Sequence, residues 1–405
     1  MINTIDLFAG CGGLTDGFKS ADEFRSLAAI EWELWPCETL KQRLVSKWGY
    51  APNNNVVLRF DIQRTQELFR GWENDPLYGS HNGLDKVVGD RNVDLIIGGP
   101  PCQAYSIAGR VRDKNGMQDD YRNFLFEAFM KVVSHYRPKA FVFENVEGML
   151  SAKPGGVTIV ERIIKEFEKF GYATIRDFKK YALINAVDYG VPQNRKRVII
   201  LGVNKTELGE VNPDEALKDF YLRILPKYRS GKSVTVEEAI SDLPKLMPIS
   251  GINPKPSHSP CRSDIQNHTP RFHSKRDQRI FRELASDVLN GRLRYPNAES
   301  LISLYFKETG KVSKFHKHHV LDKNLPSTTI PAHLFKDGLR HIHPDPDQAR
   351  SITPREAARL QGFDDDFNFF GSIGEQYKMI GNAVPPPLGR AIGLATRDFF
   401  KMYLR

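Results

Sequence analysis

The chain has 405 residues, more than one hydrophobic core usually supports, so two domains are expected. It carries 58 lysines and arginines against 49 acidic residues, and the net charge of +9 at pH 7 suits a polyanionic partner. Four widely spaced cysteines exclude a disulfide framework and predict no metal site, and no apolar run approaches the ~20 residues of a membrane span. We expect a soluble protein of a reducing, intracellular compartment.

The first 18 residues predict a strand that passes into a glycine turn and then a helix. The turn has the sequence Phe8-Ala9-Gly10-Cys11-Gly12-Gly13. Glycines allow positive φ and close approach of the backbone to a ligand, and the first amides of the next helix lack intrahelical partners. Because the spacing departs from the dinucleotide fingerprint, the turn alone does not predict a pyrophosphate site.

Two further strands are predicted near residues 26–30 and 56–58, and each is followed by an acidic residue. Glu31 and Trp32 end the first of them, and Asp61 follows the second. In doubly wound folds, an acidic side chain about 20 residues after the glycine turn binds ribose hydroxyls. An ordinary strand-end carboxylate and a core tryptophan are the alternatives. Residues 63–92 predict a helix and a loop without visible chemistry.

Cys102 follows the most distinctive stretch of the chain. The apolar run 93–97 predicts a buried strand, and Gly98-Gly99-Pro100-Pro101 ends it abruptly. The prolines stiffen the turn, and ligands of open α/β sheets bind beyond the carboxyl ends of the strands. A buried, inert thiol is the alternative for the isolated residue. Residues 106–122 combine basic side chains with glycine and serine hinges, which suits a lid over an anionic substrate.

Two later strands carry charged residues at their ends. Glu144 follows the strand predicted at 140–143, in the same layer as Cys102, where apolar neighbours raise a carboxyl pKa. Arg195 and Arg197 occupy alternate positions at the start of the strand predicted at 198–203, so both can contact one ligand. The alternatives are a turn carboxylate and a charged edge strand that prevents aggregation.

Residues 205–330 differ in composition from the rest of the chain. Prolines, basic residues and histidines are frequent there, which predicts a less regular domain with short helices such as 277–289. The histidines at 316, 318 and 319 lack cysteine or carboxylate partners at ligand spacing, so we expect phosphate contact or exposure rather than a metal. Regularity returns with a helix capped by Thr353 and a last helix reaching about Phe400.

Taken in order, these motifs resemble those of the DNA cytosine-5 methyltransferases over about residues 1–203 and 326–398. The motifs are Asp6 to Gly13, Glu31-Trp32, Asp61, Pro100-Pro101-Cys102-Gln103, Glu144-Asn145-Val146, Gln193 to Arg197, Arg355 to Arg359 and Gly381 to Pro385. The resemblance implies an α/β, Rossmann-like S-adenosylmethionine-dependent methyltransferase domain, formed by 1–204 and 331–405. It also implies a smaller, irregular target-recognition domain at 205–330.

The resemblance implies S-adenosyl-L-methionine as the methyl donor. Phe8 and Trp32 would lie against the adenine, Glu31 would bind the ribose, and Asp61 would lie near the adenine amino group. The full set of implied cofactor contacts is Phe8, Ala9, Gly10, Gly12, Gly13, Leu14, Glu31, Trp32, Asp61, Ile62, Pro100, Asn382, Ala383 and Val384.

The same resemblance assigns the catalytic and DNA contacts. The Cys102 thiolate would add to carbon 6 of a flipped cytosine, Glu144 would contact nitrogen 3, and Arg197, supported by Arg195, would bind the base oxygen. The implied DNA contacts are Gln103, Ser106, Arg110 and Arg122.

The implied setting is a prokaryotic cytoplasm, on the nucleoid, with double-stranded DNA as partner, a monomeric enzyme and a cognate restriction endonuclease. A tRNA cytosine-5 methyltransferase is the runner-up, and the large basic insert argues against it. A catalytically silent DNA-binding protein is a further alternative, and the intact Cys102, Glu144 and Arg197 argue against it. A nicotinamide-dependent oxidoreductase does not fit the glycine spacing.

Overall fold

The computed structural model describes residues 1–101, 125–153, 157–252, 254–261, 264–312 and 317–404. The chain divides into two compact units. The first unit comprises Met1–Tyr189, Lys196–Gly231 and Ala383–Arg405, and the second comprises Gly190–Arg195 and Lys232–Asn382. In the described ranges, no helix combines the length and apolar character needed to cross a membrane. The target-recognition domain at 205–330 stays a prediction.

A mixed β-sheet forms the centre of the first unit. Among the described residues its strand order is β3-β2-β1-β6-β7-β10-β8, and β9 also pairs with β10. The strands are β1 (Ile2–Leu7), β2 (Phe24–Glu31), β3 (Val57–Arg59), β6 (Leu95–Gly98), β7 (Ala140–Val146), β8 (Tyr172–Thr174), β9 (Leu183–Asn185) and β10 (Lys196–Asn204). The first five strands of this order run parallel, and β10 is antiparallel to β7. Their carboxyl ends therefore share one edge.

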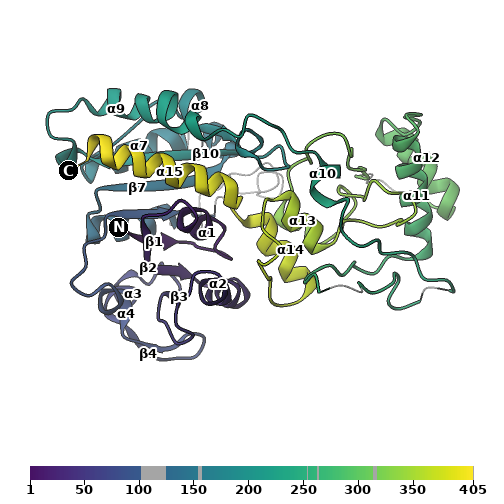
Figure 1. The fold of residues 1–405 in the computed structure, drawn as a ribbon, viewed down its shortest axis with the longest axis horizontal. Coiled ribbons are helices and arrows are strands. Elements are labelled where there is room, and N and C mark those ends of the chain that lie inside the picture. The colour runs from purple at the N-terminus through teal and green to yellow at the C-terminus, as the bar shows by residue number, and fades with distance from the viewer. Residues whose placement is uncertain (102–124, 154–156, 253, 262–263, 313–316, 405) are drawn as a thin grey trace. The chain divides into compact units, whose positions relative to one another are not determined.

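Helices surround this sheet. They are α1 (Gly13–Lys19), α2 (Leu34–Ser46), α3 (Thr65–Arg70), α4 (Gly83–Val88), α6 (Leu125–Tyr136), α7 (Ile159–Lys169), α8 (Phe178–Tyr181), α9 (Pro213–Asp219) and α15 (Pro386–Tyr403). The C-terminal helix α15 packs beside α1 (Figure 1). A Cβ atom on Gly17 would lie 2.7 Å from the Gly389 backbone, so this close packing requires glycine.

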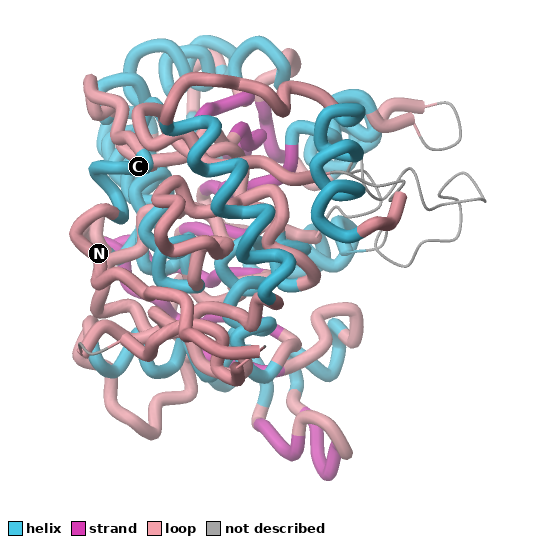
Figure 2. The backbone as a smooth tube through the Cα atoms, turned by 90° about the vertical axis from the view of Figure 1, so that its right-hand side faces the viewer, coloured by secondary structure: helices cyan, strands magenta, loops and turns pink. Residues whose placement is uncertain are grey.

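Residues 63–92 differ from the predicted helix and loop. They form α3, a hairpin of β4 (Trp72–Asp75) and β5 (Gly79–His81), and α4. Figure 2 shows this hairpin as the pair of short strands at the lower end of the chain. Trp72 stacks on Phe60 with ring centroids 3.8 Å apart. Tertiary packing of this kind stabilises strands too short to show a sequence pattern.

The second unit is mainly helical and irregular. Its helices are α10 (Val236–Ile240), α11 (Lys275–Leu289), α12 (Ala298–Thr309), α13 (Pro354–Leu360) and α14 (Ile373–Asn382). Helices α11 and α12 pack through Phe281 and Leu304 into a small apolar core with Ile342. Helix α13 begins, as predicted, at a Thr353 cap, in which the hydroxyl accepts a hydrogen bond from the amide of Glu356.

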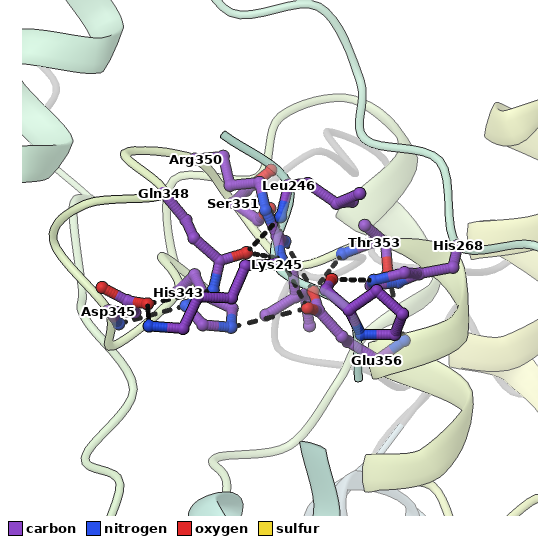
Figure 3. Close-up of polar contacts among 12 residues, drawn as sticks. Lys245, Leu246, His268, His343, Asp345, Gln348, Arg350, Ser351, Thr353 and Glu356 are labelled. Carbon is purple, nitrogen blue, oxygen red and sulfur yellow. Dashed lines mark hydrogen bonds and ion pairs between the residues drawn. The ribbon is translucent and has the colours of Figure 1, made fainter. Parts of the chain in front are cut away.

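A buried polar cluster lies beside α13 (Figure 3). Both terminal nitrogens of Arg350 donate to the Glu356 carboxylate, at 2.6 and 2.7 Å, and His343 Nε2 lies 3.4 Å from it. Burial by itself raises the pKa of Glu356, but Arg350 and His343 outweigh burial and hold this pKa well below its usual range. The cluster therefore contains a paired, ionised carboxylate inside the protein.

Candidate active site

The parallel strands bring the predicted site residues of the first unit into one row. Leu7, at the end of β1, pairs with Ile30 of β2 on one side and with Gly98 of β6 on the other. Gly98 in turn pairs with Phe143 of β7. The next residue of each strand therefore lies at the same edge, and these residues are Phe8, Glu31, Gly99 and Glu144.

The glycine turn after β1 leaves room for a ligand. Phe8, Gly10 and Gly12 all have positive φ, of 60°, 55° and 92°. A Cβ atom at Gly10 would meet no atom of the described residues within 4 Å, whereas one at Gly12 would lie 2.3 Å from Leu40 Cδ1. The φ of 92° favours glycine at position 12, where the turn packs on Leu40 of α2, and Gly10 exposes its backbone to open space.

The Glu31 carboxylate is held by backbone amides. Its Oε2 accepts from the amide of Gly10 at 3.0 Å, and its Oε1 accepts from those of Trp32 and Glu33 at 2.8 Å. Burial raises the pKa of Glu31 and the amides partly oppose that effect. Trp32 is 45% exposed, which a core tryptophan is not. Strand β2 thus ends in a fixed carboxylate beside an accessible indole.

Asp61 follows β3 at the same edge. The amide of Phe60 donates to the Glu31 carbonyl at 2.9 Å, which fixes this segment to the end of β2. Asp61 Oδ1 accepts from the amide of Gln63 at 3.0 Å, and Ile62 is buried. The structure thus places Glu31, Trp32 and Asp61 in neighbouring segments.

The turn after β6 is packed against β7. A Cβ atom at Gly99 would lie 2.6 Å from Glu144 Oε2, so only glycine allows this approach. Asn145 Nδ2 donates to the Pro100 carbonyl at 3.4 Å. Cys102, Gln103, Ser106, Arg110 and Arg122 lie outside the described residues. The turn that leads to Cys102 is therefore packed against β7 at Gly99 and Pro100.

Glu144 and Arg197 form an ion pair between β7 and β10. Arg197 Nε lies 2.9 Å from Glu144 Oε1, and their side chains are 12% and 11% exposed. The antiparallel register pairs Glu144 with Ile199 and Arg197 with Val146, so the two charged residues are diagonal neighbours on one face. Burial lowers the pKa of Arg197 and Glu144 opposes that change. An arginine remains charged at neutral pH, so Arg197 places a cation beside the Glu144 carboxyl group.

Arg195 has different partners from Arg197. We expected Arg195 and Arg197 to point to the same side because side chains alternate along a strand. Strand β10 begins only at Lys196, so Arg195 lies outside the strand and this alternation does not apply to it. Its terminal nitrogens donate to the carbonyls of Ile330 and Gly381, both at 3.0 Å, in the interior of the second unit. The joint contact of both arginines with one ligand stays a prediction.

Gln193 and Asp6 belong to the quoted motifs but were assigned no role from the sequence, and the structure gives each a clear local role. Gln193 is buried, donates to the Leu360 carbonyl at 3.2 Å and accepts from the Ile330 amide at 3.0 Å, so with Arg195 it connects distant segments of the second unit. Asp6 lies buried on β1, where the Thr15 hydroxyl donates to it at 2.5 Å and burial raises its pKa to about 7. The sequence signal for a buried carboxyl group at Asp6 was the presence of an acidic residue within an apolar strand.

The last predicted motif is divided between the units. Asn382 ends α14 in the second unit, and Ala383 and Val384 begin the final segment of the first. Val384 is buried. Their common contact with a cofactor stays a prediction.

The fold and the row of site residues define an α/β methyltransferase. The C-5 cytosine-specific DNA methylase family matches residues 2–397, and the chain belongs to that family. It is therefore a DNA cytosine-5 methyltransferase, which transfers a methyl group to carbon 5 of cytosine in DNA.

The similarity to known proteins extends over nearly the whole chain. The Type II methyltransferase M.Bpa9945I of Bacillus paralicheniformis is 34% identical over 451 residues, covering 97% of this chain and 98% of that protein. The Type II methyltransferase M1.HphI of Haemophilus parahaemolyticus is 32% identical, covering 96% and 85%. A solved structure of an E. coli prophage protein, described as a DNA modification methyltransferase, has 25% identity and a TM-score of 0.66, covering 99% and 100%.

Proposed function

We propose that the enzyme methylates a cytosine flipped out of a specific duplex DNA sequence, through a covalent bond between Cys102 and carbon 6 of the base. The observation that carries this proposal is the ionic pair of Glu144 and Arg197, 2.9 Å apart at the sheet edge, against which Gly99 and the proline turn pack. This arrangement brings an acceptor and a cation next to the chain segment that leads to Cys102.

The residues at the same edge fit S-adenosylmethionine. The open space over Gly10 admits a ligand to the backbone, Glu31 offers a fixed carboxylate to ribose hydroxyls, and Trp32 offers an accessible ring. The remaining proposed contacts are Phe8, Ala9, Gly12, Gly13, Leu14, Asp61, Ile62, Pro100, Asn382, Ala383 and Val384. S-adenosylmethionine bound there supplies an electrophilic methyl group for carbon 5.

Carbon 5 of cytosine is a poor nucleophile, and the proposed residues overcome this. The Cys102 thiolate forms a bond to carbon 6 and breaks the 5,6 double bond, which gives an enamine nucleophilic at carbon 5. Glu144 contacts nitrogen 3 and favours its protonation, while Arg197 binds the base oxygen and the charge that develops there. After methylation, loss of the carbon 5 proton to a base restores the double bond and releases the thiolate. Arg195 supports Arg197 in this role.

The proposed substrate is duplex DNA. Because neither face of a base stacked in a duplex is accessible to attack, the target cytosine must be flipped out. The net charge of +9 and the basic stretch at 205–330 support a polyanionic partner and a recognition role for that stretch. Gln103, Ser106, Arg110 and Arg122 are the proposed DNA contacts. The names of the Type II relatives support a cognate restriction endonuclease, and we propose a monomer acting in a prokaryotic cytoplasm, on the nucleoid.

The test offers labelled S-adenosylmethionine to genomic duplex DNA and to a tRNA pool, followed by mapping of 5-methylcytosine. We expect label in duplex DNA at one short recurring sequence. Cys102→Ser should abolish transfer and retain cofactor affinity. Label confined to tRNA, or turnover by the serine variant, would contradict the proposal.

A further inference from the structure

The hairpin of β4 and β5 lies beside the proposed adenine end of the cofactor site. It packs on Phe60, the residue before Asp61, through the stacked Trp72 ring and the edge of the Tyr78 ring, with centroids 3.8 and 5.1 Å away. Because the amide of Phe60 is bonded to the Glu31 carbonyl, the hairpin is coupled to the end of β2.

One guanidinium connects the hairpin tip with Trp32. Arg59 Nη1 donates to the Leu77 carbonyl at 3.0 Å, and its Nε donates to the Trp32 carbonyl at 3.3 Å. The same guanidinium lies 5.5 Å from the centre of the Tyr78 ring, within the range of a cation–π contact. The tip is therefore held against the segment that carries the accessible indole.

The conformation of the tip is fixed from within. Asp75 Oδ1 accepts from the amides of Leu77 and Tyr78 at 2.9 and 3.0 Å, and its Oδ2 lies 2.5 Å from Arg64 Nη1. Trp72 Nε1 donates to the Tyr78 carbonyl at 3.3 Å. These contacts position the half-buried Tyr78 ring before any ligand binds, which lowers the entropic cost of binding.

We propose that Tyr78 is an additional cofactor-binding residue, and that the hairpin closes the adenine end of the site; this inference rests on the proposed S-adenosylmethionine site. Tyr78 and Asp61 lie on adjoining segments, and together a phenol and a carboxylate offer a donor and an acceptor to a purine edge. Their proximity also affects titration, since burial raises the pKa of Tyr78 and the Asp61 carboxylate adds to that rise.

The test is calorimetric titration of the full chain with S-adenosylmethionine and, separately, with S-adenosylhomocysteine, which shares the adenosine and lacks the methyl group. Tyr78→Phe should weaken binding of both ligands by about 5-fold, as expected for one lost hydrogen bond. Tyr78→Ala should weaken both by about 10-fold or more. Tyr181→Ala is the matched control, because α8 packs against β9 and β10, and it should bind as the wild type does.

The variant Glu31→Ala distinguishes failure of the Tyr78 inference from failure of the proposed cofactor site. If Glu31→Ala weakens both ligands and both Tyr78 variants bind normally, Tyr78 is not a cofactor contact and the inference is overturned. If Glu31→Ala also leaves affinity unchanged, the proposed site itself is wrong and the inference fails with it. Tyr78→Phe keeps the ring packed on Phe60, so it provides the test even if the alanine variant does not fold.

Discussion

The two units use buried charged side chains differently. The sheet interior of the first unit is largely apolar, with Ile96, Phe141 and Ile199 fully buried, and its buried charges, such as Asp6 and the Asp16–Arg43 pair, bond to other side chains. In the second unit, buried arginines such as Arg355 lie among irregular segments. Strands satisfy their own backbone groups, whereas irregular segments need side chains to do so. Arg355, for example, donates to the carbonyls of Gln266, Asp364 and Phe367.

In the second unit, the fully buried pair of Arg350 and Glu356 should contribute strongly to stability. Arg350→Met leaves Glu356 buried without its main partner, which should cost about 3–5 kcal/mol of unfolding free energy. Urea denaturation followed by circular dichroism measures this loss. Adding Glu356→Leu to Arg350→Met should recover much of it. A double variant as unstable as the single one would show that the pair is not what stabilises this unit.

In the first unit the sensitive position is a glycine beside Glu144, the proposed catalytic carboxylate. Gly99→Ala places a methyl group 2.6 Å from Glu144 Oε2, so the carboxylate must move. We expect kcat to fall by about 10²-fold, as for a displaced catalytic group, with cofactor affinity retained. Gly374→Ala is the control, because its new Cβ would lie 3.8 Å from its nearest neighbour. Equal turnover by both variants would argue against a role for Glu144 in catalysis.

The two units should respond to acid in opposite directions. Burial lowers the pKa of His258 to about 4 and that of His273 to about 3, so below pH 6.5 protons bind first to the unfolded state. Lowering the pH from 7 to 5 should therefore reduce the unfolding free energy of the second unit by about 2 kcal/mol for each of these two histidines. Burial raises the pKa of Asp6 to about 7, so its folded form gains protons and the first unit gains about 2 kcal/mol over that interval.

Hydrogen exchange resolved by segment, at pH 7 and pH 5 and corrected for intrinsic rates, measures both changes. Asp6→Asn is the matched variant, because it keeps a hydrogen-bonding side chain opposite Thr15 and cannot titrate. This variant should remove the pH dependence of hydrogen-exchange protection in β1 and leave that of the second unit unchanged. Parallel responses of the two units would contradict this account of their interiors.

The smallest expected difference concerns helix caps. Thr353 caps α13 in the buried cluster, and Thr158 caps α7 at the surface of the first unit, both as complete capping boxes. Thr353→Ala should cost about 1–2 kcal/mol, and Thr158→Ala should cost less than 1 kcal/mol, because water replaces an exposed cap more readily. Thermal unfolding compares them, and a larger loss for Thr158→Ala would reverse the expectation.

Strand ends were predictable because an apolar run that stops at glycine, proline or a charged residue has few other solutions. That logic located Glu31, Gly99 and Glu144. It did not predict the hairpin at 72–81, whose three- and four-residue strands are stabilised by packing on Phe60 rather than by any local pattern.

The interior of the second unit was less predictable from the sequence. His258 is bonded to the carbonyl of Gln348, 90 residues away, and no local pattern specifies such a partner. Arg195 shows a related difficulty, because alternation in the sequence indicates a shared face only within a strand, and β10 begins one residue later. The α12 helix, Ala298–Thr309, is another of the short helices expected in this region, although its bounds were not specified from the sequence.

The most direct test of the central claim is capture of the covalent intermediate. Duplex DNA containing 5-fluorocytosine has no removable proton at carbon 5, so an enzyme that forms a carbon 6 adduct stays attached after methyl transfer. Mass spectrometry of the digested complex should identify a peptide in which Cys102 carries the methylated base. An enzyme that methylates ordinary duplex DNA yet forms no adduct with the fluorinated duplex would contradict the mechanism.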